Sequence, residues 1–123
     1  MGRSRQLCQR IKAYIDESFG DPALGISAVG SKFEMSGAYL SRLFADTIGS
    51  TIAAYITSVR IENARKMLKK DSMSVEEISE ACGFLSSSTF IRLFKKIEGM
   101  TPGAYRKLCN EDAASGEDDL TQG

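Results

Sequence analysis

Residues 36–55 and 86–105 are two versions of one segment, placed fifty positions apart. The segment SGAYLSRLFADTIGSTIAAY recurs as SSSTFIRLFKKIEGMTPGAY, with Ser, Arg, Leu, Phe, Gly, Thr, Ala and Tyr in register. Two copies are too few for a solenoid, which needs about three or more stacked units to bury a continuous core. We therefore predict two copies of one small structural unit, and a repeated unit favours a binding partner that is itself periodic.

Apolar residues recur at helical spacing along almost the whole chain, and no stretch alternates convincingly with the period of two that a half-buried strand shows. The pattern therefore predicts an all-α fold. Expected caps and stops are Gly20-Asp21-Pro22, Ser36, Gly49, Ser74 with Glu77, Gly83, Ser86 or Ser87, Gly99 and Thr101. The predicted helices are one ending near residue 20, and others over about 26–33, 36–49, 51–68, 75–82, 86–99 and from 101 onwards.

The helix predicted over 51–68 carries two different apolar faces. At roughly 100° per residue, Ile52 and Ile56 lie on one face, whereas Ile61 and Leu68 lie on a face turned by well over 90°. A helix that serves one core with its first half and another core with its second half shows this change of side. Its length of about 18 residues corresponds to about 27 Å. The sequence therefore predicts a linker helix shared by two subdomains.

The predicted organisation has five parts. They are a flexible N-terminus over 1–3, a first helix-turn-helix subdomain over 4–50, the linker helix over 51–69, a second helix-turn-helix subdomain over 70–110 and a disordered acidic tail over 111–123. The formal net charge is zero, but residues 1–110 carry 16 Lys and Arg against 11 Asp and Glu, while the tail carries 5 acidic and no basic residues. Residues 1–110 are therefore modestly basic, and this charge meets the first requirement for a nucleic-acid-binding protein only weakly.

Enzymatic, metal-binding and membrane classes find little support. Cys8, Cys82 and Cys109 are odd in number and far apart, and the chain has no histidine, so we predict unpaired thiols, no metal and no cofactor. No GxSxG motif or phosphate-binding glycine loop is present, and capping or solvation explains the glutamates at 76, 77 and 80. The chain lacks an apolar run of about 18 residues and a signal-peptide start, so we expect a cytoplasmic protein without membrane contact.

The two repeated helices have similar outer faces. Leu40, Leu43, Phe44, Phe90, Leu93, Phe94 and Ile97 are predicted to face the cores. The opposite faces hold small, hydroxylic and basic groups, which suit a helix that enters the major groove of duplex DNA. A solvated face is the alternative, but the matching positions of Arg42 and Arg92 favour recognition. Either arginine could instead pack its stem on the domain and place its head on a phosphate or a helix terminus.

Phosphate contacts are predicted mainly in the second unit. The candidate residues are Lys95, Lys96, Arg106 and Lys107. The first unit has Ala45 and Asp46 where the second has the two adjacent lysines, so its grip on the DNA backbone should be weaker. Basic residues along the linker helix could add contacts or could simply be solvated; these are Arg60, Arg65, Lys66, Lys69 and Lys70.

Both units carry the signature of a known family. ISEACGFLSSSTFIRLFKKIEGMTPGAYR, at 78–106, strongly resembles the C-terminal signature of the AraC/XylS family of bacterial transcription regulators. Residues 36–68, with SGAYLSRLF, the glycine at 49 and YITSVRIENARKML, resemble that family's first recognition helix and linker helix. The likeness covers about residues 5–107, and the pattern FxRxFKKxxGxTPxxYR is far more specific than a bare helix-turn-helix match.

The resemblance implies seven helices in two homeodomain-like helix-turn-helix subdomains, with both recognition helices in successive major grooves of double-stranded DNA. Such grooves recur about every 34 Å, and the linker helix has a length of that order. The family's base contacts map to Ala38, Ser41, Arg42, Ser87, Ser88, Thr89 and Arg92. The implied function is sequence-specific DNA binding as a transcription regulator, by family resemblance an activator, with RNA polymerase as a further partner. We expect a monomeric fragment whose sensing or dimerising domain is absent. The alternative to the DNA-binding function is a helical protein-interaction module that has lost DNA binding.

Four residues depart from the family's pattern. Gly30 stands where the family usually has Ala, which costs about 0.5 to 1 kcal/mol of helix stability. Glu34 occupies a turn position often held by Gly, and Ser86 replaces a common Asp as cap. Ile91 replaces a small polar residue on the outer face, where it either touches a thymine methyl group or packs inward.

Overall fold

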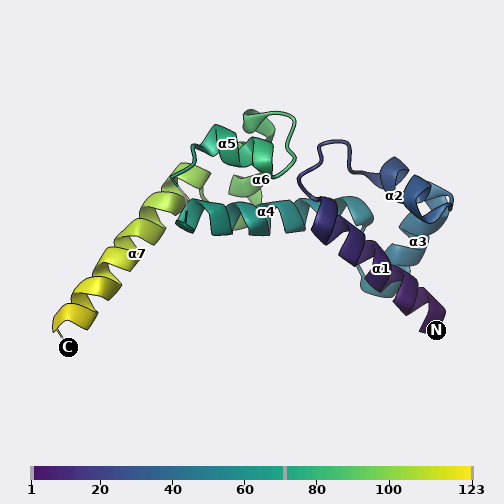
Figure 1. Cartoon of the computed structure of the whole chain (residues 1–123), viewed down its shortest axis with the longest axis horizontal. Coiled ribbons are helices and arrows are strands. Elements are labelled where there is room, and N and C mark those ends of the chain that lie inside the picture. The colour runs from purple at the N-terminus through teal and green to yellow at the C-terminus, as the bar shows by residue number, and fades with distance from the viewer. Residues whose placement is uncertain (1, 71, 123) are drawn as a thin grey trace. The chain divides into compact units, whose positions relative to one another are not determined.

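The computed structural model describes the backbone of residues 2–70 and 72–122, and the side chains of residues 2–70 and 72–112. Within this part of the chain there are seven α-helices and no strand, which confirms the predicted all-α fold (Figure 1). Their bounds are α1 Gly2–Ser18, α2 Ile26–Phe33, α3 Gly37–Ile48, α4 Ile52–Lys70, α5 Val75–Ala81, α6 Ser87–Glu98 and α7 Pro102–Gln122.

The helices after each tight turn begin and end in the same way in both copies of the repeat. These are α3 and α6, the two helices that the family resemblance implies to be recognition helices. A serine side chain caps each of them, a glycine in the left-handed conformation ends it, and a threonine side chain caps the helix that follows. These residues are Ser36, Gly49 and Thr51 in the first copy, and Ser86, Gly99 and Thr101 in the second. Ser74 and Glu77 form the predicted capping box of α5, and the bond from the Ser74 N–H holds the pKa of Glu77 below its usual value. Local side-chain chemistry therefore sets the helix boundaries.

The chain divides into two compact units that meet inside α4, between Glu62 and Asn63. The first unit, residues up to 62, has a core that includes the first apolar face of α4. The core residues are Cys8, Ile11, Ile15, Leu24, Val29, Leu40, Phe44, Ile52, Ile56 and Val59. In the second unit, residues from 63 onwards, the buried apolar side chains include Ile78, Phe90 and Phe94. The linker helix predicted over 51–69 was expected to serve two cores, and the boundary between the units lies inside that range.

Helix α4 has a double role in the repeat. On α1, the buried residues Cys8, Ile11 and Ile15 follow one another at intervals of three and four positions. The buried residues Ile61, Ala64 and Leu68 on α4 follow the same intervals. The second half of α4 thus offers the second unit the apolar face that α1 offers the first. One uninterrupted helix, visible in Figure 1, closes the first unit and opens the second.

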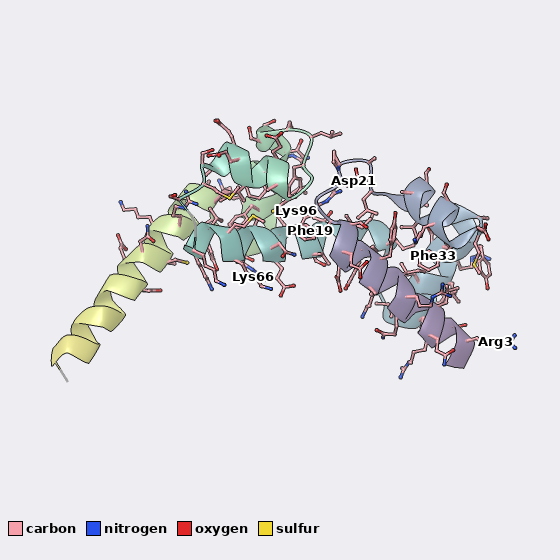
Figure 2. The ribbon with its side chains drawn as sticks, in the orientation of Figure 1. Arg3, Phe19, Asp21, Phe33, Lys66 and Lys96 are labelled. Carbon is pink, nitrogen blue, oxygen red and sulfur yellow. The ribbon has the colours of Figure 1, made fainter. Side chains whose placement is uncertain are left out.

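Each unit also contains an arginine that bonds backbone carbonyl groups near the end of its first helix. Arg60 donates from Nε to the Phe19 carbonyl and from Nη2 to the Asp21 carbonyl, both at 2.9 Å. Figure 2 labels these two acceptor residues in the connection that follows α1. Arg106 donates from Nε to the Leu68 carbonyl at 3.2 Å. The Leu68 carbonyl is one of the last of α4, which lack partners within the helix, so Arg106 caps that helix end. The bonds of Arg60 hold the connection that follows α1.

The structure differs from the predicted chain ends. Helix α1 already includes Gly2 and Arg3, which the sequence analysis placed in a flexible segment, and Met1 of that segment lies outside the described residues. The backbone of α7 is helical to Gln122, although composition predicted a disordered tail from residue 111; Gly123 again lies outside the described residues. Extending an existing helix needs no new nucleation, so a polar segment can continue one that the core has started.

Ile97 is the one predicted core residue of α6 that lies in solvent. Its side chain is 49% exposed, whereas Phe90 and Phe94 on the same helix are fully buried. Its direction differs from that of Phe90 by only about 20°, so the exposure goes with its place in the last turn of α6. The prediction of Ile97 as a core residue was therefore wrong.

Tyr55 on α4 supports a test of the first unit's packing. Its hydroxyl donates to Asp16 Oδ1 at 3.1 Å, and burial together with this bond raises the pKa of Tyr55 to about 12. Because the unfolded value is about 10, the contribution to stability is complete below about pH 10 and is lost as pH rises through about 12. We expect Tyr55→Phe to lower the free energy of unfolding at pH 7 by about 1 kcal/mol.

Urea titrations of both proteins at pH 7, 10 and 12, followed by circular dichroism, measure this difference. The gap between wild type and Tyr55→Phe should shrink between pH 10 and 12. A gap that stays constant over this interval would show that the hydrogen bond to Asp16 does not stabilise the folded state.

Candidate nucleic-acid interface

Helix α3 turns its buried and exposed faces as the sequence predicts. Leu40 and Phe44 are fully buried, while Ala38 and Arg42 are exposed and Ser41 is half-buried. The capping bond from the Tyr39 N–H to Ser36 Oγ, at 3.2 Å, fixes the start of the helix. The exposed side of α3 therefore carries small groups around one cation, Arg42.

Helix α6 presents a richer face in the second unit. Ser88, Arg92 and Lys95 follow one another at intervals of four and three residues, so they lie along one side of the helix. All three side chains are exposed, and Lys96 beside them, labelled in Figure 2, is exposed too. The face thus combines a hydroxyl, a guanidinium and two ammonium groups.

The hydroxyl groups at the start of α6 form a connected set. Ser86 Oγ accepts from the Thr89 N–H at 3.3 Å, donates to Thr89 Oγ1 at 2.9 Å and lies 3.3 Å from Ser88 Oγ. Of the predicted base contacts here, Ser87 and Thr89 are half-buried and Ser88 is exposed. The structure therefore leaves Ser88 the most accessible of the three.

The same turn positions both recognition helices. In the first unit, Met35 N–H donates to the Gly30 carbonyl at 3.0 Å, and in the second, Phe84 N–H donates to the Ser79 carbonyl at 3.0 Å. Each turn contains one residue with positive φ, Glu34 at 55° and Gly83 at 88°. A residue with a side chain costs about 1–2 kcal/mol in this left-handed conformation. The turn geometry is therefore retained even where the sequence makes it costly.

Gly30 has a role in this turn that the sequence analysis missed. A Cβ atom at Gly30 would lie 2.9 Å from the Met35 carbonyl oxygen and 3.4 Å from the Gly37 amide nitrogen. The second unit holds Ser79 at the corresponding position, but one more residue separates its turn from the next helix cap. Gly30 thus allows a short turn to press α2 against the start of α3, which offsets its cost in helix stability.

The five arginines from residue 42 onwards fall into two groups. Arg60 and Arg106 bond backbone carbonyls, and Arg65 forms an ion pair with Glu98. Arg42 and Arg92 are exposed, and within the part of the chain that the structure describes they form no hydrogen bond or ion pair. The alternative in which these two heads serve a helix terminus thus has no support, and both remain available to a ligand.

Free lysines are concentrated in the second unit. Lys95, Lys96 and Lys107 are exposed, as is Lys66 on α4, which Figure 2 labels. Arg106, predicted as a phosphate contact, is half-buried and uses its Nε for the Leu68 carbonyl. Residues 63–110 carry nine basic and five acidic groups, whereas residues 1–62 carry seven and six. The second unit is therefore the more attractive one for a polyanion.

Tyr39 is an accessible side chain that the sequence analysis did not include among the candidates. It is 56% exposed and follows Ala38 in the first turn of α3. The sequence did contain a signal for Tyr39, because this aromatic residue lies outside the apolar stripe predicted to be buried on α3. Its phenol adds a hydrogen-bonding group to a face that otherwise offers little besides Arg42.

The described residues show neither a metal-ion cluster nor a membrane-spanning helix. No group of three or more cysteine, aspartate and glutamate side chains gathers there to hold a metal ion. The three cysteines form no disulfide bond in the described part of the chain, and Cys8 and Cys82 are buried. Nor does any helix in the described ranges combine the length and the apolar character needed to cross a membrane. The paired recognition helices remain the strongest candidate site.

Known proteins match both the sequence and the fold. A protein family described as "Helix-turn-helix domain" matches residues 29–108. The uncharacterized HTH-type transcriptional regulator YijO of Escherichia coli K12 is 38% identical over 105 residues, which cover 85% of the chain and 37% of YijO. Transcriptional activator NphR of Rhodococcus is 34% identical over 98 residues, which cover 80% of the chain and 29% of NphR.

Among solved structures, the C-terminal domain of AraT, a response regulator from Geobacillus stearothermophilus, superposes with a TM-score of 0.81. The two are 28% identical, and the match covers 83% of this chain and 84% of the AraT chain. By contrast, the chain spans only about a third of the length of the curated relatives it matches.

Proposed function

Because the chain belongs to the AraC/XylS family of helix-turn-helix transcription regulators, we propose that it binds double-stranded DNA sequence-specifically as the DNA-binding part of a regulator. The observation that carries this proposal is the pair of exposed arginines, Arg42 and Arg92. They occupy the same position on two helices with matching caps, and neither bonds another residue in the described part of the chain. A guanidinium placed in this way can pair with guanine O6 and N7 in the major groove.

The other candidate residues take roles that follow from their exposure and chemistry. We assign base-edge contacts to Ala38, Ser41 and Arg42 on α3 and to Ser87, Ser88, Thr89 and Arg92 on α6. Phosphate contacts fall to Lys95, Lys96 and Lys107. We assign Arg106 to holding α7 against the end of α4, because its Nε already bonds the Leu68 carbonyl. No chemical step is part of this function.

Each recognition helix would occupy its own major groove, with the two grooves about one helical turn apart. Selecting bound duplexes from a random pool tests this arrangement. We expect two conserved boxes whose centres lie about 10 base pairs apart. A single short box would mean that only one unit reads sequence.

Salt dependence separates this function from its main alternative. Affinity for duplex DNA should fall steeply between about 50 and 200 mM salt, because neutralised phosphates release counterions. A fluorescence titration with random duplex at low salt is sufficient to measure it. Complete absence of binding would favour a helical module that binds another protein.

We further infer that the regulator activates transcription, with RNA polymerase as its partner, and that it acts in the cytoplasm where bacterial DNA lies. The name of NphR, a transcriptional activator, supports this direction. A reporter gene placed downstream of the selected boxes tests it. Expression should rise when the regulator is present, and a fall would identify a repressor.

Replacing Asp46 tests the prediction that the first unit binds the DNA backbone more weakly than the second. Asp46 is exposed on α3 at the position where α6 has Lys96. We expect Asp46→Lys to raise affinity for any duplex roughly threefold to tenfold at low salt, because it adds one phosphate contact. The slope of log K against log salt should steepen by about 0.9. Salt titrations by fluorescence anisotropy measure both quantities.

Glu76→Lys is the matched control for this prediction. Glu76 is also exposed, and its replacement changes the net charge equally, but it lies on α5. The control should steepen the salt slope less than Asp46→Lys does. Equal effects of the two variants would mean that the change in affinity comes from net charge alone. Asp46 would then not lie on the DNA-facing surface.

A further inference from the structure

Ile91 breaks the polar character of the outer face of α6. Its side chain is 37% exposed, whereas the neighbouring Phe90 is fully buried, so part of the Ile91 side chain remains accessible. Ser88 precedes it by one helical turn, Arg92 follows it, and Lys95 lies one turn further on. An accessible aliphatic group thus stands within the face that the proposed function directs at DNA.

Exposure alone would mean little, since single apolar side chains are common on protein surfaces. The position of Ile91 is informative, because its face is proposed to enter the major groove, where the C5-methyl group of thymine is the one apolar feature of the base edges. The surrounding charges agree with this partner, because Arg92 follows Ile91 directly and Lys95 lies one helical turn after it, and both match the negative phosphates beside a groove. Polar base edges, in contrast, would gain nothing from an isoleucine.

Resting on the proposed function, we propose that Ile91 contacts the C5-methyl group of a thymine and so determines part of the operator sequence. The second unit then prefers an A·T pair within one or two base pairs of the pair that Arg92 reads. The corresponding residue of the first unit is Ser41, which lacks an apolar end. Its box should therefore show no methyl preference of this origin.

Replacing thymine by deoxyuridine removes the methyl group and leaves the hydrogen-bonding edge intact. For wild type, one substitution in the box of the second unit should weaken binding about fourfold, the equivalent of about 0.8 kcal/mol for one buried methyl-sized group. For Ile91→Ser, the thymine and deoxyuridine duplexes should bind equally. Ile91→Val keeps a branched apolar group and should retain part of the discrimination.

Ile97→Ser is the matched control, because it removes the same side chain from the same helix. Ile97 is 49% exposed and lies six residues after Ile91, about 240° around the helix axis. This variant should discriminate between thymine and deoxyuridine as well as wild type does. Circular dichroism melting of each variant establishes that folding is retained.

Three results would overturn the inference, and they are distinguishable. If wild type selects two boxes but no thymine in either one responds to deoxyuridine, or if Ile91→Ser keeps the full response, Ile91 does not read a methyl group and the proposed function stands. If wild type selects no sequence at all, the proposed function fails and the inference fails with it. The deoxyuridine scan on wild type needs no variant, so a misfolded mutant cannot obscure the outcome.

Discussion

Replacing Gly30 with valine is expected to destabilise the first unit by about 2 to 3 kcal/mol, near the upper end of the range for overpacked sites. The new side chain would collide with backbone, since even a Cβ atom there would lie 2.9 Å from the Met35 carbonyl oxygen. Backbone can yield only by moving α3 away from α2. The midpoint temperature of the first unit should fall by about 10 to 20 °C, given about 4 to 8 °C per kcal/mol for domains of this size.

Amide hydrogen exchange is the suitable measurement, because it resolves the two units within one chain. Protection should drop in α2 and α3 and stay close to wild type in α6 and α7. Ser31→Val is the control, since Ser31 is exposed on the same helix and the variant introduces the same β-branched side chain. If both valines destabilise equally, helix propensity and not close contact sets the requirement for glycine.

Loss of the Arg92 guanidinium should be the most damaging single change to DNA recognition. We expect Arg92→Ala to weaken binding to the selected sequence by about 1 to 3 kcal/mol, a factor of roughly 5 to 150, if the guanidinium pairs with guanine in a bidentate manner. Since Arg92 is exposed, the fold should be unaffected. Preference at one base pair should relax at the same time, and repeating the duplex selection with the variant reveals which pair.

Lys95→Ala separates base reading from attraction to phosphate. Lys95 lies on the same exposed face, and its loss should weaken binding evenly across sequences and reduce the salt slope by about 1. If Arg92→Ala behaves in this way too, its guanidinium contacts phosphate. Arg42→Ala provides the parallel comparison in the first unit, where fewer positive charges accompany the arginine.

Sequence alone predicted the features that depend on neighbours along the chain. Ser36, Gly49 and the Ser74 capping box act within three or four residues, so their patterns are legible without a structure. The change of apolar face along α4 was also predictable, since the helical repeat fixes it. These local rules were enough to give the number, order and approximate bounds of the helices.

Features that depend on distant partners were not predictable in the same way. Arg106 was predicted as a phosphate contact, and its bond to the Leu68 carbonyl, 38 positions away, is a structural role that the sequence did not indicate. Gly30 is required because the Met35 carbonyl oxygen approaches it closely. Helix propensity, which considers only the residue itself, indicated just the loss of helix stability. Ile97 shows the same limit, because periodicity gives the direction of a side chain but not where the core ends.

The shared helix α4 also limits how the chain can vary in length. Flexible connections between domains tolerate added or deleted residues, but α4 contributes Val59 to one core while Ile61, two positions later, is buried on a different face. One residue inserted between them would rotate the second face by about 100° relative to the first. One of the cores would then lose its side chains from α4, so we expect homologous sequences to align through this helix without a gap.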